Sequence, residues 1–481
     1  MEAFLQPLQG LAEFEEIKKR CGANRGILNV SGCMESQKVH LMYGLSGLFP
    51  CHLILADDER NAKEIYEDYR FYDKNVYFYP AKDLLFFQAD IHGNLLIRQR
   101  MRVIRALLEQ EEVTVVTSID GCMDFLMPLE KIRSRLLHFK SDSVIDLDQL
   151  KEELVELGYE RTGQVELPGQ FSVRGGIIDI YPLTEDNPWR IELWDDEVDS
   201  IRSFDAESQR SLENVDEITI YPAAEKMDGE DMVSFLDYFP EEKTLVFLDE
   251  LNHLAENGEG VEEEYRQSRM HREEKGEANL PEQWLCGFQE LQKKLNRRNC
   301  VAVSALSPRR SGWKINEEFD LTVKSVDSYN SSFELLVKDL LQYKRQGYRI
   351  ALLSGSRTRA ERLAKDLSEE GLNAFYSQDM DRIISPGEIM VVYGHARRGF
   401  QYPLIKFAVM TETDIFGKEQ KKRKKKKKYS GNRIQDFAEL SIGDLVVHEK
   451  HGLGIYILVE PATPTCAAIT VWEPISSLCA T

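Results

Sequence analysis

The sequence lacks several patterns that would restrict its class. Its eight cysteines are scattered without a CxxC pair, which argues against a zinc site and a disulfide framework and is typical of reduced thiols in a cytosol. No apolar run is long enough to span a bilayer, and the N-terminus has no basic-then-apolar signal pattern. We therefore expect a soluble cytoplasmic protein with no membrane partner.

Positive charge is also scarce. Lys and Arg number 61 against 82 Asp and Glu, a net charge of −21. Because an acidic surface repels phosphate backbones, the chain as a whole is a poor candidate for nonspecific DNA binding. The exception is KKRKKKKK at residues 421–428, a block of like charge that is typical of a flexible linker. Electrostatic tethering to nucleic acid is the alternative, and the two interpretations are compatible.

A complete phosphate-binding loop is missing as well. Such a loop reads GxxxxGK followed by Ser or Thr, because backbone N–H groups and Lys hold the phosphates and the hydroxyl holds magnesium. Residues 32–39 read GCMESQKV. Gly32 and Lys38 match, but Gln37 replaces the second glycine and Val39 cannot ligate a metal ion. The pattern predicts an inactive relic.

Other candidates for a motor site are similarly weak. The strand KTLVFLDE ends in Asp249 and Glu250, which resemble the metal-and-water carboxylates of such motors. Without a working loop, an acidic cap on a buried strand is the favoured interpretation. Arg357 and Arg359 offer arginine-finger chemistry but fit the start of a surface helix better. We expect no catalysis, no cofactor and no metal in this chain.

The 481 residues and 42% hydrophobic content suit three or four globular domains. Strands alternating with helices over residues 1–125 predict a parallel sheet. The pattern predicts six segments: residues 1–125 as α/β, 126–215 as strands and turns, 216–325 as helix and strand again, 326–417 as a small α/β domain, 418–433 as a Lys-rich linker, and 434–481 as the opening strands of a small β-barrel.

The segment from Val165 to Asp205 is the most informative one, and it reads as four short strands separated by Pro-Gly, Gly-Gly and TEDNP breaks. In WRIELW, Ile191 and Leu193 can face a core, and Arg190, Glu192 and Trp194 then share the opposite face. Because Trp and Arg dominate interface hot spots, this face is a candidate docking surface. A Trp covered by a neighbouring loop is the alternative.

Longer strings in and around this segment resemble a known family. RGGIIDIYP, RIELWDDEVDSIRSFD and SQRSLENVDEITIYPA are similar to the module shared by the excision-repair protein UvrB and the transcription-repair coupling factor. SGSRTRAERLAKDL, YPLIKFAVMTETDIFG and IQDFAELSIGDLVVHEKHGLGIY resemble the coupling factor alone. The resemblance extends to about Tyr456, and the chain is identified as the N-terminal part of a member of that family.

The resemblance implies a fold and a set of partners. It implies a degenerate helicase-like α/β domain with an inserted α+β UvrA-binding-type domain, a further small α/β domain and an incomplete Tudor-like (CarD-like) barrel. In the family that barrel binds the β subunit of RNA polymerase, and the inserted module binds UvrA. The family's motor lies downstream, so ATP, Mg²⁺ and most DNA contact are expected there and not in this chain.

For the UvrA contact, the resemblance implies Arg174, Arg190 and Trp194. We expect Gly175 and Gly176 to form a bulge that redirects Arg174; a structural salt bridge to a nearby acid is the alternative for that residue. The family's C-terminal domain covers this face, so in this chain we expect it to be open. The resemblance thus implies recruitment of UvrA to polymerase stalled at lesions in nucleotide excision repair.

The chain departs from the family pattern in two places, and two alternative functions remain open. Between Glu59 and Asp90 there is no room for the DNA-inserting hairpin of UvrB. The tail after Tyr456 departs from the family pattern, which predicts a truncated or frameshifted product whose barrel cannot close. The alternative functions are a UvrB-like or helicase-like DNA-dependent ATPase, and a stand-alone regulator that holds polymerase through residues 430–481.

Overall fold

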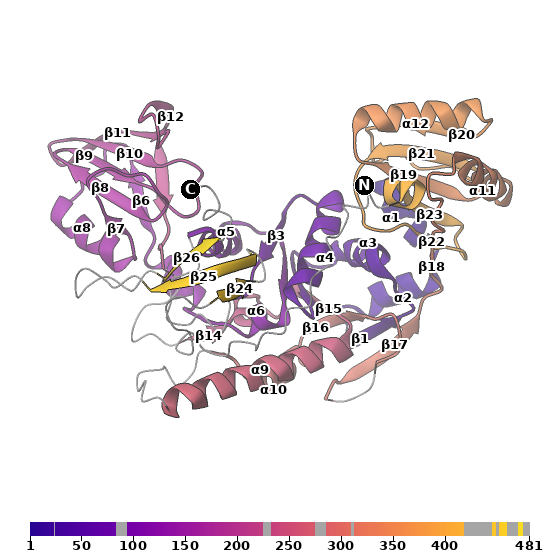
Figure 1. Cartoon of the computed structure of the whole chain (residues 1–481), viewed down its shortest axis with the longest axis horizontal. Coiled ribbons are helices and arrows are strands. Elements are labelled where there is room, and N and C mark those ends of the chain that lie inside the picture. Colours follow the sequence, from indigo (N-terminus) through magenta and orange to yellow (C-terminus); the bar gives the residue numbers. More distant parts are fainter. Residues whose placement is uncertain are drawn as a thin grey trace.

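The computed structural model describes residues 1–23, 25–82, 94–224, 232–274, 285–308 and 312–417, with three strands between 445 and 474. The Lys run at 421–428 and the predicted linker at 418–433 lie outside the described residues, as does part of the segment between Glu59 and Asp90. A central α/β domain carries a β-rich domain at one end and a second α/β domain at the other (Figure 1).

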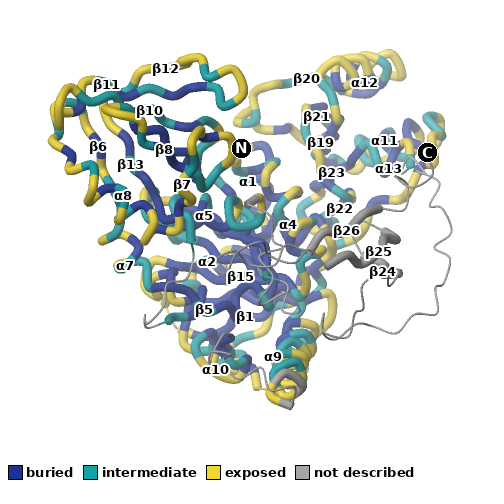
Figure 2. The backbone as a smooth tube through the Cα atoms, turned by 60° about the vertical axis from the view of Figure 1, so that its left-hand side comes forward, coloured by how far each residue is buried: buried dark blue, intermediate teal, exposed yellow. Residues whose placement is uncertain are grey.

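The central domain is built on a seven-stranded sheet whose strand pairs are all parallel, as the sequence predicted. Its order is β17 (Ile315–Asp320), β1 (Gly26–Ser31), β16 (Asn299–Val303), β15 (Thr244–Asp249), β2 (Cys51–Ala56), β4 (Val113–Ser118) and β3 (Val76–Tyr79). Every residue of β1, β4, β15 and β16 is buried, as the dark blue of β1 and β15 shows in Figure 2. Strands that are apolar on both faces require helices on both sides of the sheet.

Helices cover both faces of this sheet. One core joins it to α1 (Glu2–Leu8), α2 (Ala12–Arg20), α3 (Glu35–Ser46) and α4 (Glu59–Tyr72). The other core contains α5 (Asn94–Glu109), α6 (Ile119–Met123), α7 (Leu129–Arg133), α9 (Leu251–Glu274), α10 (Phe288–Leu295) and the 3-10 turn Phe235–Tyr238. A two-stranded ladder of β5 (Phe125–Leu126) and β14 (Val233–Ser234) lies beside this second core.

The β-rich domain is inserted in the sequence between β4 and β15 of the central sheet. Its six-stranded sheet has the order β12 (Ser211–Val215), β11 (Glu197–Phe204), β10 (Trp189–Trp194), β9 (Ile177–Ile180), β8 (Gln170–Arg174) and β7 (Glu160–Arg161). A ladder of β6 (Leu137–Lys140) and β13 (Glu217–Ile220) joins it. These strands share one apolar core, so one face of the sheet is buried and the other is left polar.

The strand-and-turn pattern between 126 and 215 does not describe α7 or Leu147–Glu156, which forms helix α8. Helices packed with strands in this segment agree with the α+β domain that the resemblance implies. Asp146 caps α8 by accepting hydrogen bonds from the backbone N–H groups of Asp148 and Gln149. Leu150 and Leu154, four positions apart, are buried against the sheet. The helix therefore covers the core face of the inserted sheet.

The second α/β domain has a mixed sheet of order β18 (Lys324–Ser325), β22 (Phe400–Tyr402), β23 (Phe407–Thr411), β19 (Arg349–Ser354), β21 (Glu388–Tyr393) and β20 (Asn373–Tyr376). Its helices are α11 (Phe333–Gln346), α12 (Arg357–Glu369) and α13 (Glu412–Phe416). One face of the sheet packs on α11 and α12. The other face belongs to the same core as α1 to α4, so this domain and the central domain share a continuous apolar interior.

Three antiparallel strands follow, β24 (Leu445–His448), β25 (Gly452–Leu458) and β26 (Thr470–Pro474). The predicted opening strands correspond to β24 and β25, and β26 comes from the tail that departs from the family pattern. In the part of the chain that is described, no helix is long and apolar enough to cross a membrane.

Candidate functional site

The polar face of the inserted sheet carries a cluster of charged side chains centred on Asp179 of β9, which is fully buried. Arg190 of β10 lies directly opposite it in the ladder. The Arg190 guanidinium donates to both carboxylate oxygens, from Nε at 2.6 Å and from Nη2 at 2.9 Å. It also donates to Gln209 Oε1 at 3.0 Å and lies 4.3 Å from the centre of the Phe204 ring. Arg190 is therefore held on all sides, and its hydrogen bonds to Asp179 raise its pKa.

Arg174 reaches the same carboxylate from β8. Its Nη2 donates to Asp179 Oδ2 at 2.7 Å, and 47% of its side chain remains exposed. The salt bridge proposed as the alternative for Arg174 is thus present, and the rest of the side chain is accessible on the surface.

The expected bulge at Gly175 and Gly176 was wrong. These residues form the two-residue turn that joins β8 to β9, with Arg174 paired to Ile177 across it. Gly175 has a φ of +60°, a conformation that glycine adopts without strain and that tight hairpins require at this place. The register of this sheet is irregular elsewhere, between β10 and β11 at Glu192 and Leu193, and between β11 and β12 from Arg202 to Phe204.

Trp194 is the last residue of β10 and is 80% exposed. Ile191 is buried in the core of the domain and Leu193 packs partly against it, so strand parity places Trp194 on the polar face with Arg190. The side chain is therefore not covered by a neighbouring loop of the described chain. A large aromatic side chain on a regular strand is a typical anchor for a protein partner.

Asp179 was not singled out from the sequence, although it determines the geometry of this face. In GIIDIYP it stands between Ile178 and Ile180, and both of these are buried. Strand alternation alone would have placed Asp179 on the polar face. A carboxylate on the same side of the sheet as two arginines was the available signal.

The relic of the phosphate loop is closed by ion pairs. Lys38 Nζ lies 2.7 Å from Asp249 Oδ1 and 2.6 Å from Glu250 Oε1. Although burial acts to lower the pKa of Lys38, these two carboxylates outweigh it and raise the pKa. Asp249 also accepts a hydrogen bond from Asn61 Nδ2 at 2.7 Å. The four groups satisfy one another, so the lysine is occupied within the chain.

Gly32 has a φ of +78°, and a Cβ atom at this position would lie 2.1 Å from the carbonyl oxygen of Leu321. This glycine therefore allows close approach of the chain that follows β17. Val39 is fully buried in the core. Gln37 accepts from the Met34 N–H at 3.0 Å and donates to the Tyr402 hydroxyl of the second α/β domain at 3.0 Å.

The second α/β domain makes further contacts with this loop. Ser36 Oγ donates to Asp68 Oδ2 at 2.7 Å and accepts from the Arg398 N–H at 3.1 Å. Arg397 Nε lies 3.1 Å from the same Asp68 oxygen. The loop that the sequence predicts to be a degenerate nucleotide site thus forms a joint between two domains of the chain.

Arg357 and Arg359 lie at the start of α12, where the sequence placed them. Arg359 Nη1 is 3.1 Å from Glu412 Oε2, and its Nε donates to Ser356 Oγ, the capping residue of the helix. Within the described residues no group of three or more His, Cys, Asp or Glu side chains has metal-ligand geometry.

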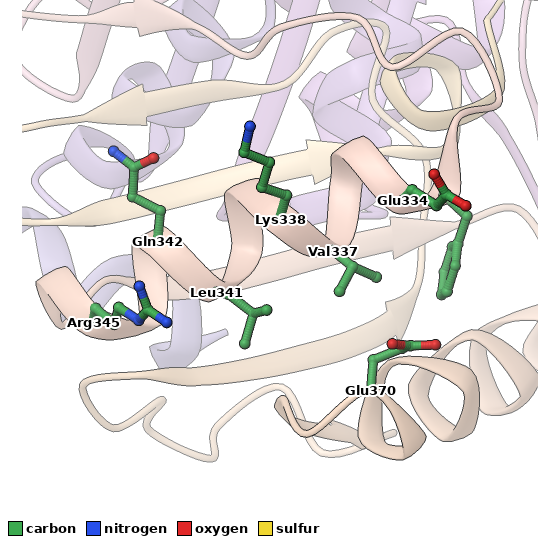
Figure 3. A pocket seen from close by; sticks show the side chains of 8 residues that line it. Glu334, Val337, Lys338, Leu341, Gln342, Arg345 and Glu370 are labelled. Atoms are coloured by element: carbon green, nitrogen blue, oxygen red, sulfur yellow. The ribbon is translucent and has the colours of Figure 1, made fainter.

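A shallow cavity of about 510 Å³ runs along α11. Val337 and Leu341 point from this helix toward the end of α12, where Glu370 lies (Figure 3). It lies in the second α/β domain and contains no residue of the Asp179 cluster or of the phosphate-loop relic.

Comparison with known proteins assigns a class to the inserted domain. Residues 137–225 match the family described as the UvrB interaction domain. The match covers the whole six-stranded sheet, with Asp179, Arg190 and Trp194.

The chain as a whole is similar to transcription-repair-coupling factors, which confirms the resemblance predicted from the sequence. It is 28% identical to that of Bacillus subtilis across 90% of this chain and 43% of the relative. Identity is 26% to the factor of Staphylococcus aureus MRSA252, across 80% of this chain and 38% of the relative, and 27% to one from Staphylococcus epidermidis, across 81% and 38%. The chain therefore spans less than half the length of these relatives, and it is similar to their N-terminal portion.

Proposed function

We propose that the chain acts as the N-terminal part of a transcription-repair coupling factor and recruits UvrA to RNA polymerase stalled at DNA lesions. The observation that supports this most directly is the exposed Trp194 beside the Asp179–arginine cluster, on a sheet that matches the UvrB interaction domain. UvrB and the coupling factors share this module, and the partner that the resemblance implies for it is UvrA.

The geometry supports a different role for each of the three expected contact residues. Arg190 is held by Asp179 and Gln209, so it mainly fixes the shape of the face. Arg174 keeps half of its side chain accessible, and Trp194 has nearly all of its ring available. Trp194 is therefore the anchor in this proposal, Arg174 is a second direct contact, and Arg190 is the residue that positions them.

The proposal assigns no catalysis and no cofactor to this chain. Lys38 is engaged by Asp249 and Glu250, and the loop around it contacts the second α/β domain. ATP, Mg²⁺ and most DNA contact would belong to motor domains of the full-length family. The strands β24 to β26 would contribute to contact with the polymerase β subunit. The competing function is a UvrB-like or helicase-like ATPase, and DNA-stimulated ATP hydrolysis by the purified chain would favour it.

Capture of purified UvrA by the immobilised chain tests the main proposal. Replacing Trp194 by Ala removes an exposed side chain and leaves the Asp179 cluster intact. Loss of an anchor costs about 2 kcal/mol or more, or roughly 30-fold in affinity. Tyr393→Ala, which shortens an exposed aromatic residue of the second α/β domain, is the matched control. Equal capture of UvrA by wild type and Trp194→Ala would overturn the assignment.

A further inference from the structure

The docking face extends beyond Trp194 onto a segment that the sequence did not highlight. Residues 142–145 pair with residues 196–198, at the start of β11, through the backbone bonds from Asp142 N, Ile145 N and Val198 N, at 2.8 to 3.0 Å. Val144 lies opposite Glu197 in this ladder, and Glu197 lies opposite Trp194. Because directly opposed residues point to the same side, Val144, Glu197 and Trp194 form one row across the sheet.

This row exposes two apolar side chains. Val144 is 72% exposed and Trp194 is 80% exposed. Ile145 follows Val144 and Val198 follows Glu197, and both are buried in the domain core. The backbone that carries the exposed row is therefore fixed by core packing. The structure thus presents two exposed apolar side chains in one row, with Glu197 between them, at the end of β10 opposite the residues 185–186 that pair with α5 of the central domain.

Acidic side chains surround this pair. Asp195 and Asp196 form the turn of the β10–β11 hairpin, and Asp142, Glu197 and Asp199 lie on the adjoining strand segments. All five are exposed, and no Lys or Arg of the described chain forms an ion pair with any of them. Of the two nearby arginines, Arg190 is engaged by Asp179, and Arg174 pairs with the same carboxylate while about half of its side chain stays exposed. The field around Trp194 is therefore negative, although the resemblance drew attention to arginines.

From this arrangement we infer that UvrA meets this end of the sheet with an apolar pocket bordered by Lys or Arg side chains, and that Val144 enters the pocket beside Trp194. The inference rests on the proposed UvrA-binding function. The apolar pair supplies contact area, and the acidic border supplies orientation and a salt-dependent association rate, because rim charges act chiefly on encounter. An acidic pocket rim on the partner is disfavoured by like-charge repulsion.

The charge part of the inference is tested with the full chain and purified UvrA at about 50 and about 300 mM salt, concentrations that change screening strongly. The variant Asp195→Asn, Asp196→Asn, Glu197→Gln, Asp199→Asn removes four charges, and Asn tolerates the φ of +62° at position 195. We expect about ten-fold weaker binding at low salt and a smaller loss on adding salt. Glu152→Lys, on the exposed side of α8 behind the sheet, is the control. Binding equal to or tighter than wild type would overturn a basic rim.

The apolar part is tested by Val144→Ser against Val155→Ser. Val155 is another exposed valine of the same domain, on α8 over the opposite face, and is 57% exposed. We expect Val144→Ser to weaken UvrA binding about five-fold or more, the range expected for an apolar contact removed from a pocket, and Val155→Ser to leave it unchanged. Equal binding by the two variants would exclude Val144 from the interface.

Trp194→Ala, measured beside these variants, separates the two levels of the proposal. If Trp194→Ala abolishes capture while the Val144 and acidic variants behave as their controls do, UvrA docking stands and the inferred partner chemistry is wrong. If Trp194→Ala also binds UvrA normally, the docking function itself is wrong. Circular dichroism of each variant establishes that the domain is folded.

Discussion

The strongest prediction concerns the pair formed by Asp179 and Arg190. Arg190→Ala removes three hydrogen bonds, two of them to a fully buried carboxylate, and leaves Asp179 with one bond from Arg174. Removing one partner of a buried ion pair typically costs 3–5 kcal/mol, since the other charge remains desolvated. Because Arg174 still compensates in part, we expect a loss of about 3 kcal/mol in the stability of the inserted sheet.

Hydrogen exchange measures this loss where it occurs. The chain has several domains, so a global unfolding curve does not report on one sheet alone. The reporters are the amides of the ladder that joins residues 177–180 of β9 to residues 189–192 of β10. The strands of the central sheet are the internal control. Arg190→Ala should accelerate exchange in the first set by about two orders of magnitude and leave the second set unchanged.

A second variant decides whether the buried charge is the cause. In the double variant Asp179→Val, Arg190→Met the carboxylate is absent, and apolar replacement of a buried pair is often neutral or stabilising. We expect this variant to recover most of the protection that Arg190→Ala loses. Protection in Arg190→Ala within about 1 kcal/mol of wild type, or no recovery in the double variant, would refute the view that Asp179 organises this face.

Three further predictions concern the central domain and its joint with the second α/β domain. Burial lowers the pKa of His40 to about 4 from 6.5. Between these pH values the unfolded chain therefore binds more protons than the folded chain, so the folded state loses stability as the pH drops. We expect a loss of about 2 kcal/mol by pH 5 in denaturant titrations, and we expect His40→Gln to abolish this loss. Lys38→Met should leave the buried Asp249 without its cation and lower the stability of the central domain by about 3 kcal/mol. A fluorescent ATP analogue should bind neither the wild type nor this variant. Nucleotide binding by the wild type would contradict a lysine occupied by Asp249 and Glu250. Gly32→Ala should destabilise the central domain by about 2 kcal/mol or more, because the new Cβ meets a backbone oxygen and the φ is positive; an unchanged melting temperature would disprove that constraint.

Much of this architecture could be predicted from local patterns. The buried strands of the central sheet are short apolar runs with helices between them, and their short length, β-branched residues and flanking turns identify them as strands. Strand parity also predicts Arg190 and Trp194 on one face of the sheet. The turn at Gly175 and Gly176 was predictable in principle, since two glycines between alternating strands are a hairpin signal.

What could not be predicted depends on contacts between distant segments. Nothing in GIIDIYP shows that Asp179 faces Arg190, because that depends on the register between β9 and β10. The joint between Gln37 and Tyr402 connects positions 365 residues apart. Likewise, Val144 shares a row with Trp194 only because residues 142–145 pair with the start of β11. A single sequence contains no direct record of such pairings.

At the Lys38 loop and on the polar face of the inserted sheet, buried charged groups are satisfied by partners within the chain. The two sites differ in what remains exposed for a ligand or partner. At the phosphate-loop relic, Lys38 is engaged by Asp249 and Glu250, and segments of a neighbouring domain cover the loop; a group whose hydrogen bonds are all satisfied internally has little left for a ligand. On the inserted sheet the charges of the Asp179 cluster are also satisfied internally, but Trp194 and Val144 remain uncovered. Binding energy there must come mainly from apolar burial, while the arginines hold the surface in shape. It follows that truncating Trp194 should weaken docking without affecting folding, whereas truncating Arg190 should affect both.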